Sequence, residues 1–327
     1  QSPSGAQARA YLTEQRRLTE KTIRRFGIGY APDSWDFLHS RLTAKGYTDE
    51  ELKAAFLCGI SQKGHPYDVF RNRVIFPIFD LNGEVVAFAG RRLNEKDERK
   101  YVNTSDTPAF KKSKVIFGMN FAKRSEAGSL IVCEGPIDAI ALQQAGFDNA
   151  CASMGTALTS EQLQLLSRYT KELVLCYDND DAGKVATQKA LTLLNSTDFQ
   201  VKVLELPKRL VDGQYIKQDA DDFIKFQGRD AFEHLLSGSE SGMDFRMSQL
   251  KSKFDLTSDE GRIGYAEAAA ALLAAVPNAV EREIYTVRAS EAAGITPDAM
   301  KLEVERARKR ARYKEKREQE RRDLNPA

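Results

Sequence analysis

The sequence predicts three successive parts: a mixed α+β part, an α/β part with a parallel sheet covered by helices, and a bundle of helices. Two strand-like runs in the first part meet at Leu81-Asn82-Gly83, and Asn-Gly is a hairpin signal. From about residue 128, runs of strand length alternate with runs of helix length, which is typical of a parallel sheet. After Gly242 only helix-like patterns remain. The expected parts are residues 1–125, 126–240 and 241–327.

The first part is expected to combine short helices with a β-hairpin. Its helix-like patterns cover residues 6–16, 19–30, 34–46 and 48–59. The runs "RVIFPIFD" and "EVVAFAGRRL" follow, and their β-branched and aromatic residues are typical of strands.

The second part is expected to alternate strands with helices. The strands are expected at residues 129–135, 149–155, 171–178 and 199–207, and the helices at 136–146, 159–169 and 181–195. Thr159 or Ser160 is expected to cap the second of these helices. Ligands of such sheets bind outside the carboxyl ends of the strands, so the residues at those ends are candidates for a site.

The third part is expected to contain four helices, at residues 244–254, 259–276, 279–294 and 296–322. The last one turns into charge on every face. A helix of that kind is typically a solvated connector that leaves the globule.

Composition places few limits on function. The chain has 327 residues, and its 49 Lys and Arg against 47 Asp and Glu give a net charge of +2. The cations gather in residues 91–114 and in the C-terminal tail. The four cysteines form no C-x-x-C pair and are expected to be small buried hydrophobes in a reducing cytoplasm. No signal peptide and no membrane span is predicted. Because the sequence opens on Gln1, we expect it to be a piece of a longer protein.

Acidic residues end the predicted strands of the second part. Glu134 ends the first strand, and Asp178 and Asp180 end the third. A further group follows the last strand: Asp219, Asp221 and Asp222. Carboxylates held close together repel, so a cation normally lies among them, and hard oxygen ligands favour Mg²⁺ or Mn²⁺. No histidine lies near these motifs, which argues against a zinc site.

An alternative needs no metal. Asp and Asn at a strand end are common turn and N-cap residues, and "DNDDAG" could simply open a helix. Aspartate clusters at a strand end also occur in receiver domains and in metal-dependent phosphatases. The ordered set of strand-Glu-Gly, strand-Asp-x-Asp and a later Asp-x-Asp favours the metal site.

The motifs resemble a known family. "VCEGPIDAIAL" followed by "LCYDNDDAG" resembles a Toprim domain, a Rossmann-like unit shared by bacterial primases, type IA and II topoisomerases and some nucleases. "YDVFRNRVIFPIFDLNGEVVAFAGRRL", "RKYVNTSDTPAFKKSKVIFG" and "ASMGTALT" resemble the catalytic core of bacterial DnaG-type DNA primase, in that family's order. The resemblance covers residues 7 to about 310.

The resemblance implies the roles of individual residues. It implies that Glu134, Asp178 and Asp180 are catalytic, and that Gly183 is the small residue behind the Asp-x-Asp pair. The implied metal ligands are Glu134, Asp178, Asp180, Asp219 and Asp221. The implied nucleic-acid and nucleotide ligands are Arg71, Arg73, Arg91, Lys100, Asn103 and Lys112. The sequence departs from the family in "LPKRLVDGQYIKQDADD", which is longer than usual and lacks a proline between the aspartates.

The implied function is that of a DNA primase core, a DNA-directed RNA polymerase of the primosome. It would make short RNA primers on single-stranded DNA from nucleoside triphosphates, with two or more Mg²⁺ or Mn²⁺ ions, in the bacterial cytoplasm. The family's N-terminal zinc-binding domain and C-terminal helicase-binding domain are expected to lie outside this chain. The alternatives are a Toprim-type nuclease, a non-catalytic nucleic-acid-binding Toprim module and a topoisomerase fragment. The last would need a nucleophilic tyrosine in a further DNA-binding domain, which the basic first part does not resemble.

Overall fold

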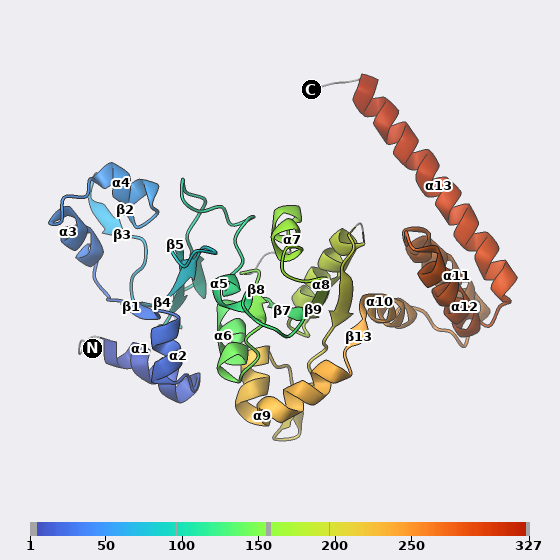
Figure 1. Ribbon diagram of the computed structural model, residues 1–327, viewed down its shortest axis with the longest axis horizontal. Coiled ribbons are helices and arrows are strands. Elements are labelled where there is room, and N and C mark those ends of the chain that lie inside the picture. Colours follow the sequence, from blue (N-terminus) through green and yellow to red (C-terminus); the bar gives the residue numbers. More distant parts are fainter. Residues whose placement is uncertain (1–4, 96, 155–157, 196, 325–327) are drawn as a thin grey trace. The chain divides into compact units, whose positions relative to one another are not determined.

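The structure is a computed structural model that describes residues 5–324, except 96, 155–157 and 196 (Figure 1). The middle of the motif "ASMGTALT" therefore lies outside the described residues. The chain forms two compact units. The first contains the residues up to Ala190 and Phe199–Ser239, and the second contains Leu191–Asp198 and the residues from Glu240 onward. The expected division into three parts stays a prediction.

The first part of the chain builds a four-stranded antiparallel sheet in the order β1-β4-β5-β6. Its strands are β1 (Gly29–Ala31), β4 (Arg73–Phe79), β5 (Val85–Arg92) and β6 (Tyr101–Asn103). The predicted turn joins β4 to β5 through Gly83, whose φ of 93° suits glycine. A small hairpin lies outside this sheet, made of β2 (Cys58–Ile60) and β3 (Pro66–Asp68). The helices are α1 (Ala6–Ala10), the π-helical η2 (Tyr11–Gln15), α2 (Glu20–Arg25), α3 (Phe37–Thr43), α4 (Asp49–Ala54) and α5 (Met119–Ala122).

Two of the predicted helices end early because a residue with positive φ follows them. The helix predicted over 19–30 ends at Arg25, because Gly27 takes a φ of 63° and the chain then extends into β1. The helix predicted over 48–59 ends at Ala54. There Phe56 takes a φ of 59° before β2 begins. In both places the sequence pattern predicted a longer helix, because it does not show where a residue adopts a left-handed backbone conformation.

The middle of the chain forms a parallel sheet in the order β10-β9-β7-β8, with a helix after each of its strands (Figure 1). The predicted elements are confirmed as β7 (Ser129–Cys133), α6 (Pro136–Gln144), β8 (Ala150–Ala152), α7 (Ser160–Leu166), β9 (Glu172–Cys176), α8 (Asp181–Leu194) and β10 (Gln200–Val203). Thr159 caps α7 in a capping box with Gln162. Cys133 lies opposite Cys176, so β7 and β9 end side by side.

A hairpin that the sequence analysis did not predict interrupts the path from β10 to α9 (Ala220–Ser237). It consists of β11 (Arg209–Val211) and β12 (Gln214–Ile216), which pair antiparallel. Asp212 and Gly213 form its turn, both with positive φ, as Asp-Gly turns do. The hairpin accounts for the extra length of the third acidic segment.

One hydrophobic core joins the antiparallel sheet to the parallel sheet. Val74 and Phe76 of β4, Ile131 of β7 and Val174 of β9 are all buried in it. Because a close-packed core deforms little, the two sheets hold a fixed position relative to each other within the first unit.

The second unit is a helical bundle, as predicted. Its helices are α10 (Gly242–Lys251), α11 (Asp259–Ala274), α12 (Ala279–Ala293) and α13 (Pro297–Leu324), preceded by the short β13 (Glu240–Ser241). Side chains of Ser241, Ser258 and Asn278 cap α10, α11 and α12. Among the described residues, no helix is long and apolar enough to cross a membrane.

The start of α8 packs tightly against the end of β9. A Cβ placed on Gly183 would lie 1.9 Å from the carbonyl oxygen of Asp178. We expect Gly183→Ala to destabilise the protein by about 1–3 kcal/mol, because the helix or the strand end must shift. Urea unfolding measures this. Gly29→Ala is the matched control, since its added Cβ would meet nothing within 4 Å. An equal stability of both variants would contradict the packing described here.

Candidate active site

Acidic side chains gather at the carboxyl edge of the parallel sheet. Glu134 directly follows β7, and Asp178 lies two residues beyond the end of β9. Since β7 and β9 are adjacent and in register up to their last residues, the two carboxyl groups emerge next to each other. The backbone amide of Asp178 also donates to Glu134. The strand pairing alone thus brings these two predicted residues together.

Asp180 serves the local structure as well as the acidic edge. Its Oδ1 accepts a 2.7 Å hydrogen bond from the backbone amide of Gly183, in the first turn of α8. This is the capping role that the sequence left open for "DNDDAG". The charge of Asp180 also raises the pKa of Glu134 and of Asp178, so it lies within electrostatic reach of both.

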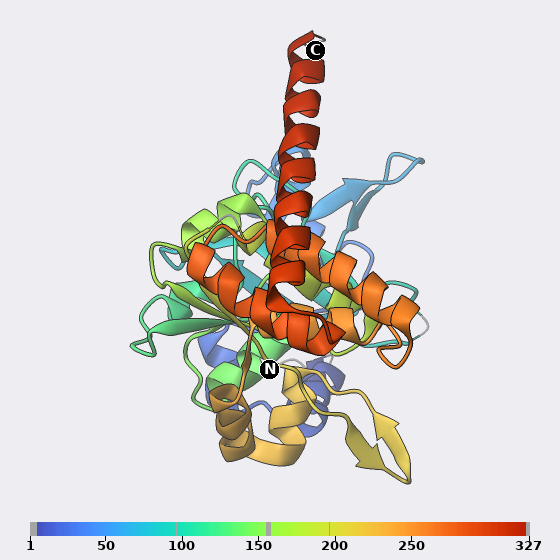
Figure 2. The ribbon, with the colours of Figure 1, turned by 90° about the vertical axis from the view of Figure 1, so that its right-hand side faces the viewer.

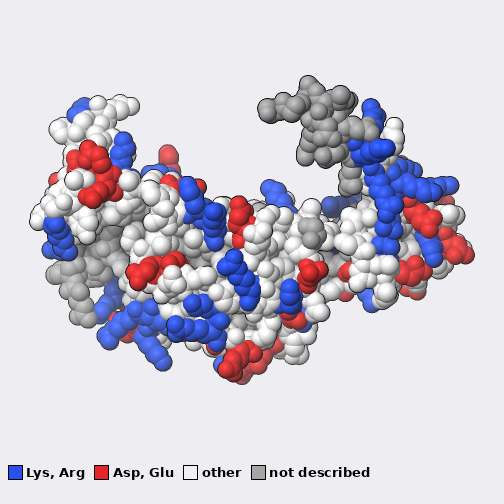
Figure 3. All heavy atoms as spheres, turned by 45° about the horizontal axis from the view of Figure 1, so that its top comes forward, with Lys and Arg blue, Asp and Glu red and all other residues white. Residues whose placement is uncertain are grey.

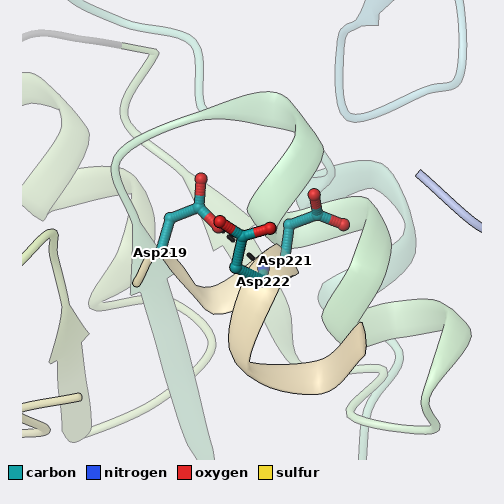
Figure 4. A group of neighbouring side chains, drawn as sticks. All are labelled: Asp219, Asp221 and Asp222. Carbon is teal, nitrogen blue, oxygen red and sulfur yellow. Dashed lines mark hydrogen bonds between the residues drawn. The ribbon is translucent and has the colours of Figure 1, made fainter. Parts of the chain in front are cut away.

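The third acidic segment opens α9. The carboxylate oxygens of Asp219, Asp221 and Asp222 lie within 4.8 Å of one another. Asp219 caps the helix, and its Oδ1 accepts a 2.7 Å bond from the amide of Asp222 (Figure 4). Asp222 is paired with Lys225 of the next turn. The three aspartates therefore stay close together although the hairpin of β11 and β12 precedes them.

Asp221 differs from its neighbours because it is buried. It is 1% exposed and forms an ion pair with Arg16 of the N-terminal segment. Burial raises its pKa, and the Arg16 guanidinium opposes that rise. Breaking such a buried pair is strongly destabilising, so the contact fastens the third acidic segment to the N-terminal segment.

Sequence reasoning missed Asp138. It is a buried residue of α6 whose two carboxyl oxygens accept from the backbone amides of Gly135 and Asp221. Burial and the charges of Asp219 and Asp178 raise its pKa well above the ordinary value. Its position four residues after Glu134, within the same quoted motif, was the available signal. In this environment Asp138 joins the first and third acidic segments through backbone hydrogen bonds.

One cavity of about 340 Å³ brings acidic and basic residues together. Of the predicted site residues, those that line it are Glu134, Asp178, Asp219, Arg91, Lys100 and Asn103. The acidic members come from the parallel sheet and the start of α9, and the others from the antiparallel sheet and the loop between β5 and β6. Arg16 and Asp138 line it too. The cavity thus has an acidic wall and a basic wall that belong to different sheets.

A second cavity of about 730 Å³ shares Arg16, Arg91, Lys100 and Asp219 with the first, so the two adjoin. Aromatic rings orient Arg91 between them: its guanidinium lies 4.9 Å from the ring centroid of Tyr11 and 5.8 Å from that of Tyr101. These contacts hold a cation at the junction of the two cavities.

The remaining predicted basic residues do not line either cavity. Arg71 precedes β4 and stacks on Trp35, 4.4 Å from the ring centroid. Arg73 is 3% exposed, is paired with Asp97 and donates to the carbonyl of Gly90. The backbone of Lys112 bonds to Asp106 and accepts from Gln162. Their expected roles toward nucleic acid stay predictions.

Glu134 and Asp178 of the acidic wall have raised pKa values, so they hold their protons more tightly than usual. The pKa of Asp178 rises to about 7, because burial disfavours its charge and Glu134, Asp219 and Asp180 repel it. Burial and the charge of Asp180 also raise the pKa of Glu134. Lys100 partly offsets both shifts. A bound divalent cation would relieve this repulsion, so the donor set fits a metal.

Comparison with known proteins agrees with this geometry. The sheet and its acidic edge define a protein of the Toprim-like class, and the family model of that description matches residues 131–224. The model described as the N-terminal domain of the DNA primase catalytic core matches residues 1–123. The DNA primase of Clostridium acetobutylicum is 38% identical over 299 residues, which cover 91% of this chain and 48% of that protein.

Three of the solved structures that match are similar over nearly their whole length. A DNA primase domain from Pseudomonas aeruginosa is 32% identical with a TM-score of 0.77, over 91% of this chain and 92% of that one. The RNA polymerase domain of Mycobacterium tuberculosis primase DnaG is 33% identical with a TM-score of 0.79, over 89% and 93%. A DnaG primase catalytic domain bound to single-stranded DNA is 33% identical with a TM-score of 0.77, over 91% and 92%. The chain belongs to the DnaG-type DNA primase family. It spans about half the length of the curated relatives it matches.

One expectation is wrong. The helicase-binding domain was expected outside this chain, yet a family model described as the DnaB-helicase binding domain of primase matches residues 243–298. These residues form α10, α11 and α12. The helical pattern predicted the bundle. It did not reveal the match to the helicase-binding model, because these helices carry no catalytic motif.

The raised pKa of Asp178 predicts a pH-dependent stability. Between its unfolded value near 3.8 and about 7, the folded chain binds more protons than the unfolded chain, so the free energy of unfolding falls as pH rises. Without metal, we expect Asp178→Asn to gain about 1–2 kcal/mol over the parent between pH 4 and pH 8, less than the full shift because the group is partly exposed.

Urea unfolding in EDTA across this pH range measures the difference. Asp181→Asn is the control, since Asp181 is exposed beside the same strand end. Adding Mg²⁺ at pH 8 should stabilise the parent more than the Asp178 variant. If the difference in free energy of unfolding between Asp178→Asn and the parent does not change with pH, the pKa of Asp178 is not raised in the folded protein, and the prediction is wrong.

Proposed function

We propose that this chain is the polymerase core of a DNA primase. It would join nucleoside triphosphates into short RNA primers on a single-stranded DNA template by metal-dependent nucleotidyl transfer. The observation that carries the proposal is the cavity in which Glu134, Asp178 and Asp219 share space with Arg91 and Lys100. Family membership supports it, since one similar DnaG structure has single-stranded DNA bound.

The acidic wall would hold the ions. Mg²⁺ or Mn²⁺, two or more, would be bound by Glu134, Asp178, Asp180 and Asp219. When bound, such ions stabilise the charge that develops on the transferred phosphoryl group and its attacking and leaving oxygens. Asp221 belongs to the same acidic cluster, but Arg16 already neutralises it. Its part would be to keep Asp219 in position.

The basic wall would hold phosphate. Lys100 lies close enough to the acidic wall to lower the pKa of Glu134 and Asp178, so it can contact a phosphate that the ions also hold. Arg91 and Arg16 line both cavities and offer two guanidinium groups where the cavities meet. Guanidinium groups suit bidentate phosphate binding. Asn103 adds an uncharged hydrogen-bonding group to the same wall.

The arrangement favours a polymerase over the other Toprim functions. A non-catalytic module has no need for a carboxyl group such as Asp178, whose charge burial disfavours and its neighbours repel. A nuclease would need the same acidic wall, but the adjoining 730 Å³ cavity with its cations offers room for a triphosphate beside the metal ligands.

We further propose that α10–α12 contribute to helicase binding, on the match of residues 243–298 to the helicase-binding model. The protein would act at the replication fork in the bacterial cytoplasm, together with template, nucleoside triphosphates and primer.

The role of Glu134 is directly testable. We expect Glu134→Gln to lower templated primer synthesis by about 100-fold or more, because it removes a charge but keeps the shape of the side chain. Incorporation of labelled nucleotides on a defined single-stranded template measures the rate. Glu126→Gln is the control, because Glu126 is exposed in the loop before β7.

Thermal unfolding checks that both variants fold. Parental primer synthesis by Glu134→Gln would contradict the proposed role. Loss of template length without nucleotide incorporation by the parent protein would indicate a nuclease instead.

A further inference from the structure

The described part of the final helix carries an unusually dense positive charge. Residues 306–314, in the middle of α13, have the sequence RARKRARYK, with six Lys or Arg and no acidic residue. At about 1.5 Å rise per residue, the helix places roughly one cation every 2 Å along its axis. Duplex nucleic acid carries about one phosphate per 1.7 Å. The two linear charge densities are therefore similar.

Five of the six cations are exposed, and Arg308 is half-buried. Met300 and Val304 are buried against the other helices of the second unit, and Ala307 packs partly buried against the same core. Ala311 continues this apolar line by the helical repeat and lines a groove with α11. The six cations lie at the other helical positions, so they cover the whole arc outside the apolar line. Figure 3 shows blue side chains gathered along this helix.

This segment, which we call the basic helix (residues 306–314), does not neutralise itself. Arg306 is paired with Glu303. Among the described side chains, no ion pair is formed by the other five cations: Arg308, Lys309, Arg310, Arg312 and Lys314. Two acidic residues, Glu267 and Glu303, line the groove that Arg308, Arg310 and Arg312 also line.

Like charges also lie close together along the basic helix. Arg306 and Arg310, Arg308 and Arg312, and Arg310 and Lys314 are like charges four residues apart. Each such pair costs about 0.2–0.5 kcal/mol. Since Lys309, Arg310 and Arg312 are exposed and form no ion pair among the described side chains, a polyanionic ligand can neutralise them.

The chemistry of the ligand follows from what the basic helix lacks. Its only uncharged side chains are Ala307, Ala311 and Tyr313, and the two alanines face the bundle side. A protein partner normally needs apolar anchors at the centre of its interface. Tyr313 is 66% exposed and is the one aromatic side chain here that could stack on a base. Because the cations point in several directions around the helix, they can contact a polyanion that approaches from different sides.

We propose that the basic helix binds the phosphodiester backbone of nucleic acid without sequence preference. This contact belongs to the second unit and does not depend on the proposed catalytic function. It would give the protein a nucleic-acid contact that persists when the catalytic cavity is empty. Figure 2 shows that α13 extends past α11 and α12.

The test compares two sets of three neutralised cations in the full chain. Lys309→Gln, Arg310→Gln and Arg312→Gln are combined in one variant, since all three are exposed and glutamine keeps helix propensity. The control combines Lys189→Gln, Lys251→Gln and Lys253→Gln, three exposed lysines outside α13. Fluorescence anisotropy gives the affinity for single-stranded DNA and for an RNA–DNA duplex over a salt series. Both sets are made in the Glu134→Gln background, so that catalysis has no part in the readout.

We expect the basic-helix variant to flatten the logarithmic salt slope for single strands by about 2, at roughly 0.7 per lost phosphate contact, and the control to keep the parental slope. A larger flattening with the duplex would identify a duplex as the preferred form. The proposal fails if the basic-helix variant keeps the parental slopes, or if the control flattens them equally. Binding to polyglutamate, a model of an acidic protein, is measured in the same way. The proposal also fails if the basic-helix variant loses only this binding, since that result would indicate an acidic protein partner.

Discussion

The pairing of β7 with β9 is the constraint on which the candidate site depends. Cys133 and Cys176 lie opposite each other, so Glu134 and Asp178 must leave the sheet at the same edge. Two carboxyl groups held there repel, and the raised pKa of Asp178 expresses that repulsion together with burial. The fold therefore gathers negative charge at this edge of the sheet. The surrounding structure places basic side chains that balance this charge.

The positive charge comes from another sheet. Lys100 and Arg91 reach the acidic wall because the antiparallel and parallel sheets share one core, which fixes the distance between them. The buried pair of Arg16 with Asp221 fastens the N-terminal segment to the start of α9. Metal ligands and phosphate ligands are thus held by different elements, and a rigid core keeps them apart by the width of a cavity. In catalysis that depends on positioning and electrostatics, such rigidity is an advantage.

Much of this arrangement could be predicted from the sequence, and what could not has physical reasons. Alternating strand and helix lengths predicted the parallel sheet, and strand ends predicted Glu134 and Asp178, because these signals are local. Asp138 was missed since its role arises from hydrogen bonds to backbone amides, one of them 83 residues away. The side chain of Arg73 is buried and paired with Asp97, a partner that the strand pattern could not reveal. Side-chain partners depend on tertiary packing, which periodicity does not encode.

The central claim is that the acidic edge exists to bind divalent metal. A crystal of the protein soaked in Mn²⁺, with anomalous diffraction recorded at the manganese edge, tests it most directly. We expect anomalous peaks in the cavity, within coordination distance of Glu134, Asp178 or Asp219. The absence of any peak there, with manganese bound only at other acidic surfaces, would contradict the account.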